Sequence, residues 1–185
     1  AKGVTSKYTG GTGHVAVFSS ALMGTISGSA VANTVSTGSI TIPMMKKSGF
    51  KPTFAAAVET AASTGGQIMP PIMWAGAFIM AQMTHIPFVT IISVSVLPAI
   101  LYFASISFYI HIHAKEHNIK GEAENVDIKA ILREGAHFLI PLVTLVGLLI
   151  YGFSPTYSAG ISIVAIIVAS YLTKTKRMGL KQILE

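Results

Sequence analysis

The segment from Phe88 to His113 contains no Lys, Arg, Asp or Glu. About 20 mostly apolar residues are enough for a helix to cross the roughly 30 Å of hydrocarbon in a bilayer. We therefore predict a transmembrane helix here, bent rather than ended by Pro98, because neighbouring helices can satisfy the carbonyl that a proline frees. The composition agrees, since only 11% of the 185 residues are charged and 51% are hydrophobic. A mean hydropathy of +0.64 likewise favours a membrane protein over a soluble domain.

Two later apolar segments predict a further pair of membrane helices. Ala136 to Phe153 and Tyr157 to Leu172 are shorter and are joined by the turn "SPT", so we expect a helical hairpin whose arms just cross the bilayer. The formal net charge of +6 comes from short basic clusters between the apolar segments. Because no aromatic residues accompany them on one face, these clusters indicate membrane topology and not nucleic-acid binding. Cysteine is absent, which excludes a disulfide framework and a cysteine metal site.

Two earlier apolar regions cannot be simple spans. The first, Val15 to Met45, contains the polar run "SGSAVANTVSTGS". Its arm Val15 to Ser27 is only about 20 Å long at 1.5 Å per residue, and the arm after the break, Val31 to Met45, is similarly short. The second, Thr53 to Thr84, is long enough, but "STGGQIMPP" at Ser63 to Pro71 cannot stay helical. Paired glycines loosen a helix, and paired prolines remove hydrogen-bond donors. We therefore expect the second region to be a broken transmembrane helix.

The positive-inside rule orients these segments. Four basic clusters flank or separate them, whereas the connections "THIP" and "SPT" carry no basic residue. With every cluster cytoplasmic, Val15 to Met45 enters and leaves on one side, which makes it a re-entrant hairpin in an all-α integral membrane protein. The predicted division is a cytoplasmic lead-in (1–14), the hairpin (15–45), a basic link with the broken helix (46–85), a transmembrane helix (86–113), a cytoplasmic loop (114–135), a transmembrane helical hairpin (136–173) and a basic cytoplasmic segment (174–185).

The two breaks carry the predicted binding chemistry. Irregular backbone at membrane depth is tolerated only where it packs in protein or faces water, because an unsatisfied amide in lipid costs several kcal/mol. Half-helix pairs that meet near the midplane form the usual site of secondary transporters, where carbonyls and hydroxyls hold a small cation and positive helix ends face an anion. We expect Pro70 or Pro71 to begin the half-helix after the second break. The predicted substrate- or ion-binding residues are Ser27, Gly28, Ser29, Asn33 and Thr37 in the first break, and Ser63, Thr64, Gly65, Gly66, Gln67 and Pro70 in the second.

A simpler interpretation of these residues is helix packing. Small residues such as Gly24 and Gly38 let helices approach closely, and hydroxyls in membrane helices often hydrogen-bond to the preceding turn. For a single serine we favour packing. Two hydroxyl-glycine breaks in the same part of one chain favour an ion or substrate site instead.

Glu59 is the only acidic residue among the first 114. A carboxylate inside a membrane is a functional candidate by default, here for ion coupling. It also lies only two turns from Lys51, so a shallow ion pair at the cytoplasmic interface is an equal alternative. His111 and His113 follow each other at a spacing of i, i+2, which places them on different helix faces, and with His117 they are expected to be interfacial rather than a metal site.

The stretch "SALMGTISGSAVANTVSTGSITIPMMKKSGFKPTFAAAVETAASTGGQIMPPIM", Ser20 to Met73, closely resembles the large membrane subunit of TRAP transporters (tripartite ATP-independent periplasmic transporters). The S-G-S-x-x-A-N run, the "GSITIPMM" exit, the "SGFKP" link and "GGQIMPP" occur in the family's order and spacing. The fit is closest to the fused type, in which the small and large membrane subunits form one chain. It is strong over Gly10 to Lys115 and weaker beyond. Many large subunits have a serine after the double proline, where this chain has Ile72.

This resemblance implies an elevator-type secondary transporter. Such a protein imports an organic anion, usually a carboxylate, together with sodium, after a periplasmic binding protein delivers the substrate. It implies a multi-pass protein of a bacterial or archaeal inner membrane, with no other cofactor than the coupling ion. The inverted second half would lie outside this sequence, which we expect to be part of a longer protein. By resemblance, the sodium donors are Ser27, Ser29, Asn33, Thr64 and Gly65.

Two other functions stay open at this point. An intramembrane serine protease also places a serine beside glycines, but "GTISG" lacks the tight glycine-x-serine-glycine spacing, and we see no histidine at a comparable depth to act as its base. A channel or a scaffold piece can use a re-entrant loop to line a pore. The second break argues for a moving domain instead.

Overall fold

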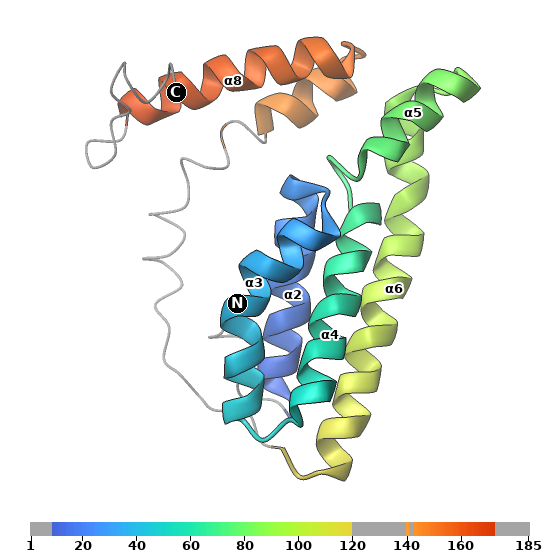
Figure 1. The fold of residues 1–185 in the computed structure, drawn as a ribbon. Coiled ribbons are helices and arrows are strands. Elements are labelled where there is room, and N and C mark those ends of the chain that lie inside the picture. Colours follow the sequence, from blue (N-terminus) through green and yellow to red (C-terminus); the bar gives the residue numbers. More distant parts are fainter. Residues whose placement is uncertain (1–8, 120–139, 141–142, 173–185) are drawn as a thin grey trace. The chain divides into compact units, whose positions relative to one another are not determined.

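The computed structural model describes residues 9–119, 140 and 143–172, and all regular structure within these ranges is helical (Figure 1). This confirms the predicted all-α class. The chain divides into two compact units, Ala1–Val126 and Asp127–Glu185. The helices of the first unit are α2 (Gly11–Ser27), α3 (Ala30–Lys47), α4 (Pro52–Gly65), the 3-10 turn η1 (Gly66–Ile68), α5 (Ala75–Thr84) and α6 (Phe88–Glu116).

The helices α2 and α3 form the predicted hairpin. Only Gly28 and Ser29 separate them, because Gly28 adopts a left-handed φ of 60° and donates its N–H to the Gly24 carbonyl at 3.1 Å, which ends α2. The Ser29 side chain then accepts the N–H of Ala32 at 3.3 Å and so caps α3. Both arms pack against each other and against α4. The break is therefore a tight two-residue reversal, and the rest of the polar segment is helical.

The predicted broken helix is present as α4, η1 and α5. Pro52 occupies the first turn of α4, where a missing N–H costs nothing. The helix ends at Gly65, and Trp74 donates its N–H to the Gln67 carbonyl at 2.9 Å across the non-helical connection 69–74. The prediction that Pro70 or Pro71 begins the next half-helix is wrong. Both lie in that connection, and α5 begins at Ala75 after the N-cap residue Trp74.

The predicted transmembrane helix is α6, which continues through Pro98 and ends at Glu116. Its 29 residues span about 44 Å at 1.5 Å per residue. Within the described residues it is the one helix whose length and hydropathy suffice to cross a membrane. Side chains such as Val94, Leu97 and Leu101 remain more than half exposed, as expected of a helix that faces lipid or further protein.

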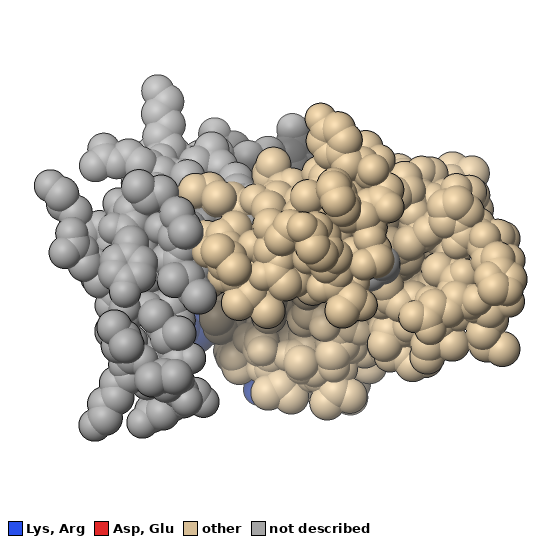
Figure 2. Space-filling view, turned by 90° about the horizontal axis from the view of Figure 1, so that it is seen from above, with Lys and Arg blue, Asp and Glu red and all other residues tan. Residues whose placement is uncertain are grey.

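The described lysines gather where α3 ends, α4 begins and α6 ends, which is the lower end of the bundle in Figure 1. We call this the basic end, and its lysines are Lys46, Lys47, Lys51 and Lys115. The start of α2 lies there too, since Gly10 donates its N–H to the Ile119 carbonyl at 3.2 Å. Both arms of the hairpin therefore begin or finish at the basic end. Seen from above in Figure 2, the described side chains are almost all uncharged.

The second unit contains a helix over 143–150, a turn, and α8 (Pro155–Leu172). Gly152 adopts a φ of 85° at the turn, and the Phe153 and Tyr157 rings stack with centroids 5.3 Å apart. Two helices joined by a short turn agree with the predicted hairpin here. The first part of its first arm, from Ala136 onward, lies mostly outside the described residues.

Candidate functional site

The two breaks meet each other in the first unit. A Cβ atom added to Gly24 would lie 2.3 Å from the Cα of Gly66, and one added to Gly28 would lie 2.2 Å from the carbonyl oxygen of Met73. Contacts this short mean that backbone packs directly on backbone, which only glycine permits. The hairpin tip therefore rests on the break between α4 and α5.

This meeting point lies halfway along α6. A Cβ atom added to Gly65 would fall 2.3 Å from the ring of Tyr102, and the Tyr102 hydroxyl donates to the Ala61 carbonyl at 2.9 Å. Tyr102 is the middle residue of α6, whose bounds are Phe88 and Glu116. If α6 crosses the bilayer, the two breaks lie near its midplane, as the sequence predicted.

A buried carboxylate joins the three helices below the breaks, toward the basic end. Glu59 of α4 is fully buried. Ser20 of α2 donates a hydrogen bond to it at 2.8 Å, and Ser63 donates another at 3.1 Å from the next turn of α4. From α3, the hydroxyls of Thr37 and Thr41 donate to its two oxygens. Three of the four hydroxyls contact Oε1 and that of Thr41 contacts Oε2, so both oxygens of the carboxylate have partners.

These contacts bear on the ion-pair interpretation of Glu59. Its partners are hydroxyls from three helices, and the exposed Lys51 is not among them in the described part of the chain. The shallow ion pair is therefore not formed. Glu59 lies eight residues beyond Lys51, about 12 Å further along the helix axis, where a carboxylate can be stable only if the protein supplies its hydrogen bonds.

Asn33 connects this network to the meeting point of the breaks. Its side chain is fully buried and donates to the Ser20 carbonyl at 2.8 Å, which ties α3 to α2. A Cβ atom added to Gly66 would lie 3.1 Å from Nδ2 of Asn33, the atom that donates this hydrogen bond. Thr37, which binds Glu59, lies one turn along α3 from Asn33. Four predicted residues, Asn33, Thr37, Ser63 and Gly66, are thus brought together with Glu59.

The other predicted residues have different surroundings. Ser29 donates its N–H to the Ser27 hydroxyl at 3.3 Å, so both side chains serve the helix reversal. Thr64 is exposed, and its hydroxyl donates to the Thr60 carbonyl at 2.8 Å. This hydrogen bond to the preceding turn fits the simpler interpretation, in which hydroxyls in membrane helices serve packing. Gln67 and Pro70 are half-buried in and after η1.

Sequence reasoning missed two members of the network, Ser20 and Thr41. Helical spacing could have found them, because Asn33, Thr37 and Thr41 recur every four residues on one face of α3. Ser20 similarly precedes Gly24 and Gly28 on one face of α2. The sequence shows these stripes, but it does not show that both turn toward the one acidic residue on α4.

The histidine prediction rests on the spacing of His111 and His113, and it stays a prediction. His111 is exposed and lies near His14, with ring centroids 6.5 Å apart. His113 instead lies with Glu116 and His117 on the last turn of α6, where the potential ligand atoms of all three are within 4.8 Å of one another. The spacing that matters is i, i+3, i+4, which places three side chains on one helix face.

The whole chain is similar to one known protein family. A family model described as "Tripartite ATP-independent periplasmic transporter, DctM component" matches residues 1–185. The Salmonella typhimurium protein YgiK, itself uncharacterized, is 25% identical over 168 residues, which is 89% of this chain and 38% of YgiK. The uncharacterized protein y4mL of Sinorhizobium fredii is 32% identical over 102 residues, 55% of this chain and 24% of y4mL. The chain thus spans well under half the length of these relatives.

The backbone contact between the breaks predicts a strict size limit at Gly24. Gly24→Ala should lower the free energy of unfolding of the full-length protein by about 1–3 kcal/mol, because the new methyl group has only the Gly66 backbone to meet. Gly160→Ala on α8 is the matched control, since nothing lies within 4 Å of its added Cβ in the described chain. Thermal unfolding of the detergent-purified variants measures both. Equal melting temperatures would contradict the contact.

The carboxylate network predicts unequal effects for two serine variants. Ser20→Ala removes a buried hydrogen bond to Glu59 and should cost about 1.5–3 kcal/mol of stability. Ser39→Ala removes only an exposed bond to the Ser36 carbonyl on the same helix and should stay within about 0.5 kcal/mol of the parent. The same unfolding assay compares them. A neutral Ser20→Ala variant would show that the hydroxyl does not bind Glu59.

Proposed function

Because the chain belongs to the family of tripartite ATP-independent periplasmic transporters, DctM component, we propose that it forms part of the transport path of a secondary-active permease. In this proposal the permease imports an organic anion, a carboxylate by class, together with sodium. The hairpin tip and the break of α4 supply half of the binding surface. The rest comes from parts of the permease outside this sequence, since the relatives are much longer.

The observation that supports this proposal most is the meeting of two helix breaks beside the middle of α6. Interrupted helices that meet at the midplane offer carbonyl groups to a cation and N–H groups to an anion. A helix needed only for packing would not be interrupted at that depth, because each freed backbone group requires a partner.

Sodium is the coupling ion that we propose, with oxygen donors at Ser27, Ser29, Asn33, Thr64 and Gly65. Asn33 and Gly65 lie at the meeting point of the breaks, and Ser27 and Ser29 lie at the hairpin tip. Thr64 is exposed on α4, where a further part of the permease could reach it. Backbone and hydroxyl oxygens of this kind suit a small cation in a transporter.

An elevator movement is the mechanism that we propose. Hydrogen bonds from Ser20, Thr37, Thr41 and Ser63 to one carboxylate bind α2, α3 and α4 into one body that can move as a unit. A binding protein in the periplasm would deliver the anion, and a small membrane subunit, fused in the same chain, would support the moving body. The permease would be a multi-pass protein of a bacterial or archaeal inner membrane.

The two rival functions have less support. The family is one of transporter components and not of enzymes. A serine protease needs a base beside its serine, and within the described residues the buried Ser20 binds Glu59 and Thr37 rather than a histidine. A channel or scaffold piece would use the re-entrant hairpin, but it would not need the second break to meet it.

Transport measurements test the proposal directly. We expect the full-length permease in proteoliposomes to take up a labelled carboxylate only with its binding protein and an inward sodium gradient. Replacing sodium with choline should reduce uptake to the level of protein-free vesicles. Ion current without solute uptake would favour the channel, and peptide cleavage without uptake would favour the protease.

Glu59 is proposed to couple transport to ions, and its replacement tests this role. Glu59→Gln cannot titrate, so we expect the pH dependence of uptake to become flat while uptake at its best pH falls at least about tenfold through the altered network. Lys47→Gln is the control, because it replaces an exposed ionisable side chain at the basic end that has no role in the network. A slower variant with an unchanged pH profile would leave Glu59 only a positioning role.

A further inference from the structure

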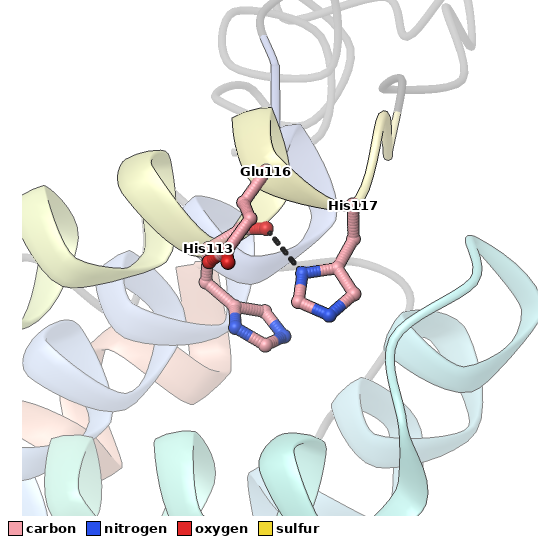
Figure 3. A group of neighbouring side chains, drawn as sticks. All are labelled: His113, Glu116 and His117. Atoms are coloured by element: carbon pink, nitrogen blue, oxygen red, sulfur yellow. Dashed lines mark hydrogen bonds between the residues drawn. The ribbon is translucent and has the colours of Figure 1, made fainter.

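The last turn of α6 presents two imidazoles and a carboxylate on one face, away from the breaks. His113, Glu116 and His117 stand at i, i+3 and i+4, and their potential ligand atoms all lie within 4.8 Å of one another (Figure 3). His113 is half-buried, and the other two are exposed at the basic end. Histidine pairs at i, i+4 are a common way for one helix to hold a transition metal.

His117 is already oriented as a metal ligand would be. Its Nδ1 atom lies 3.0 Å from the His113 carbonyl oxygen, a contact drawn as a dashed line in Figure 3. Because a carbonyl can only accept, Nδ1 must carry the hydrogen, which leaves the lone pair of a neutral ring on Nε2. Metal-binding histidines typically donate their other ring N–H to a carbonyl or a carboxylate in this way.

His113 is fixed by its aromatic neighbours. Its ring stacks on Phe54 with centroids 3.7 Å apart and planes at 10°, and Phe50 stacks at 6.2 Å. A ring held by packing loses little freedom when it binds an ion, which favours binding. The site is also at the carboxyl end of a helix, where the helix dipole attracts a cation.

We propose that His113, Glu116 and His117 bind one divalent transition-metal ion of the zinc class. Two imidazole nitrogens and a carboxylate oxygen suit zinc and its neighbours better than magnesium or calcium, which prefer all-oxygen sites. Ligands at about 2.1 Å from a tetrahedral ion stand about 3.4 Å apart, so the side chains need to close by only about 1.4 Å. Three protein ligands leave one position for water or another donor.

Nearby positive charge limits the affinity. Lys51, the N-cap residue of α4, acts electrostatically on His113, and Lys115 lies on the same turn of α6. The carboxylate of Glu116 offsets one of these charges. The pattern H-x-x-E-H also marks a class of zinc peptidases. Because this turn lies exposed at a helix end, we infer metal binding alone and no peptidase activity.

Zinc titration of the full-length permease tests the site. The protein should be purified without a polyhistidine tag and titrated with Zn²⁺ against a chromophoric chelator. We expect the parent protein to bind one equivalent of Zn²⁺ at this turn. The affinity for Zn²⁺ should be at least about tenfold weaker than that of the parent in each of His113→Phe, Glu116→Gln and His117→Gln. His113→Phe keeps a flat ring against Phe54 and so removes the ligand while retaining the stacking.

His85→Asn is the matched control for a histidine outside the cluster. His85 ends α5 with a φ of 56°, a conformation that Asn tolerates. The zinc affinity of the His85→Asn variant should equal that of the parent protein. The proposal is overturned if the three variants in the cluster bind zinc as the parent does. It is also overturned if the loss of affinity appears only in variants whose melting temperature falls in metal-free buffer.

Discussion

Backbone groups that a helix break frees inside a membrane protein must find partners within the protein, and the two helix breaks meet part of this constraint by closing on themselves and on each other. Gly28 donates its N–H to the Gly24 carbonyl of the preceding turn, and Trp74 donates its N–H to the Gln67 carbonyl across the connection 69–74. Gly24 of the first break also packs directly on the Gly66 backbone of the second. Glycine is required at this contact, because any side chain would push the two breaks apart.

The buried carboxylate imposes a second constraint of the same kind. A charge-bearing group inside a bundle is stable only when donors surround it, and Glu59 draws its donors from α2, α3 and α4. The three helices therefore cannot separate without exposing it. This makes the hairpin and the first half of the broken helix a single mechanical unit, which an elevator movement needs. Asn33 extends that unit to the breaks themselves.

The sequence predicted the features that depend on local chemistry. Gly28 and the proline pair at Pro70 are predicted to interrupt helices and do so, whereas helical backbone continues through Gly65 and Gly66 into η1. Lysine placement predicted that both hairpin arms end on one side. The features that depend on tertiary contacts could not be predicted. Nothing local shows that Glu59 faces two stripes of hydroxyls rather than Lys51, or that α5 begins at Ala75 and not at Pro70 or Pro71.

The hairpin also has the reverse polarity of a helix pair in a soluble protein. Ser20, Asn33 and Thr41 are buried inside it, whereas Phe18, Leu22 and Ile26 on α2 are all more than half exposed. Val31, Val35 and Ile40 form a similar apolar surface on α3. Large apolar surfaces of this kind need a covering of lipid or protein. The relatives supply a reason for it, because more than half of each lies beyond the matched region, so a hairpin that is polar inside and apolar outside fits one part of a larger membrane assembly.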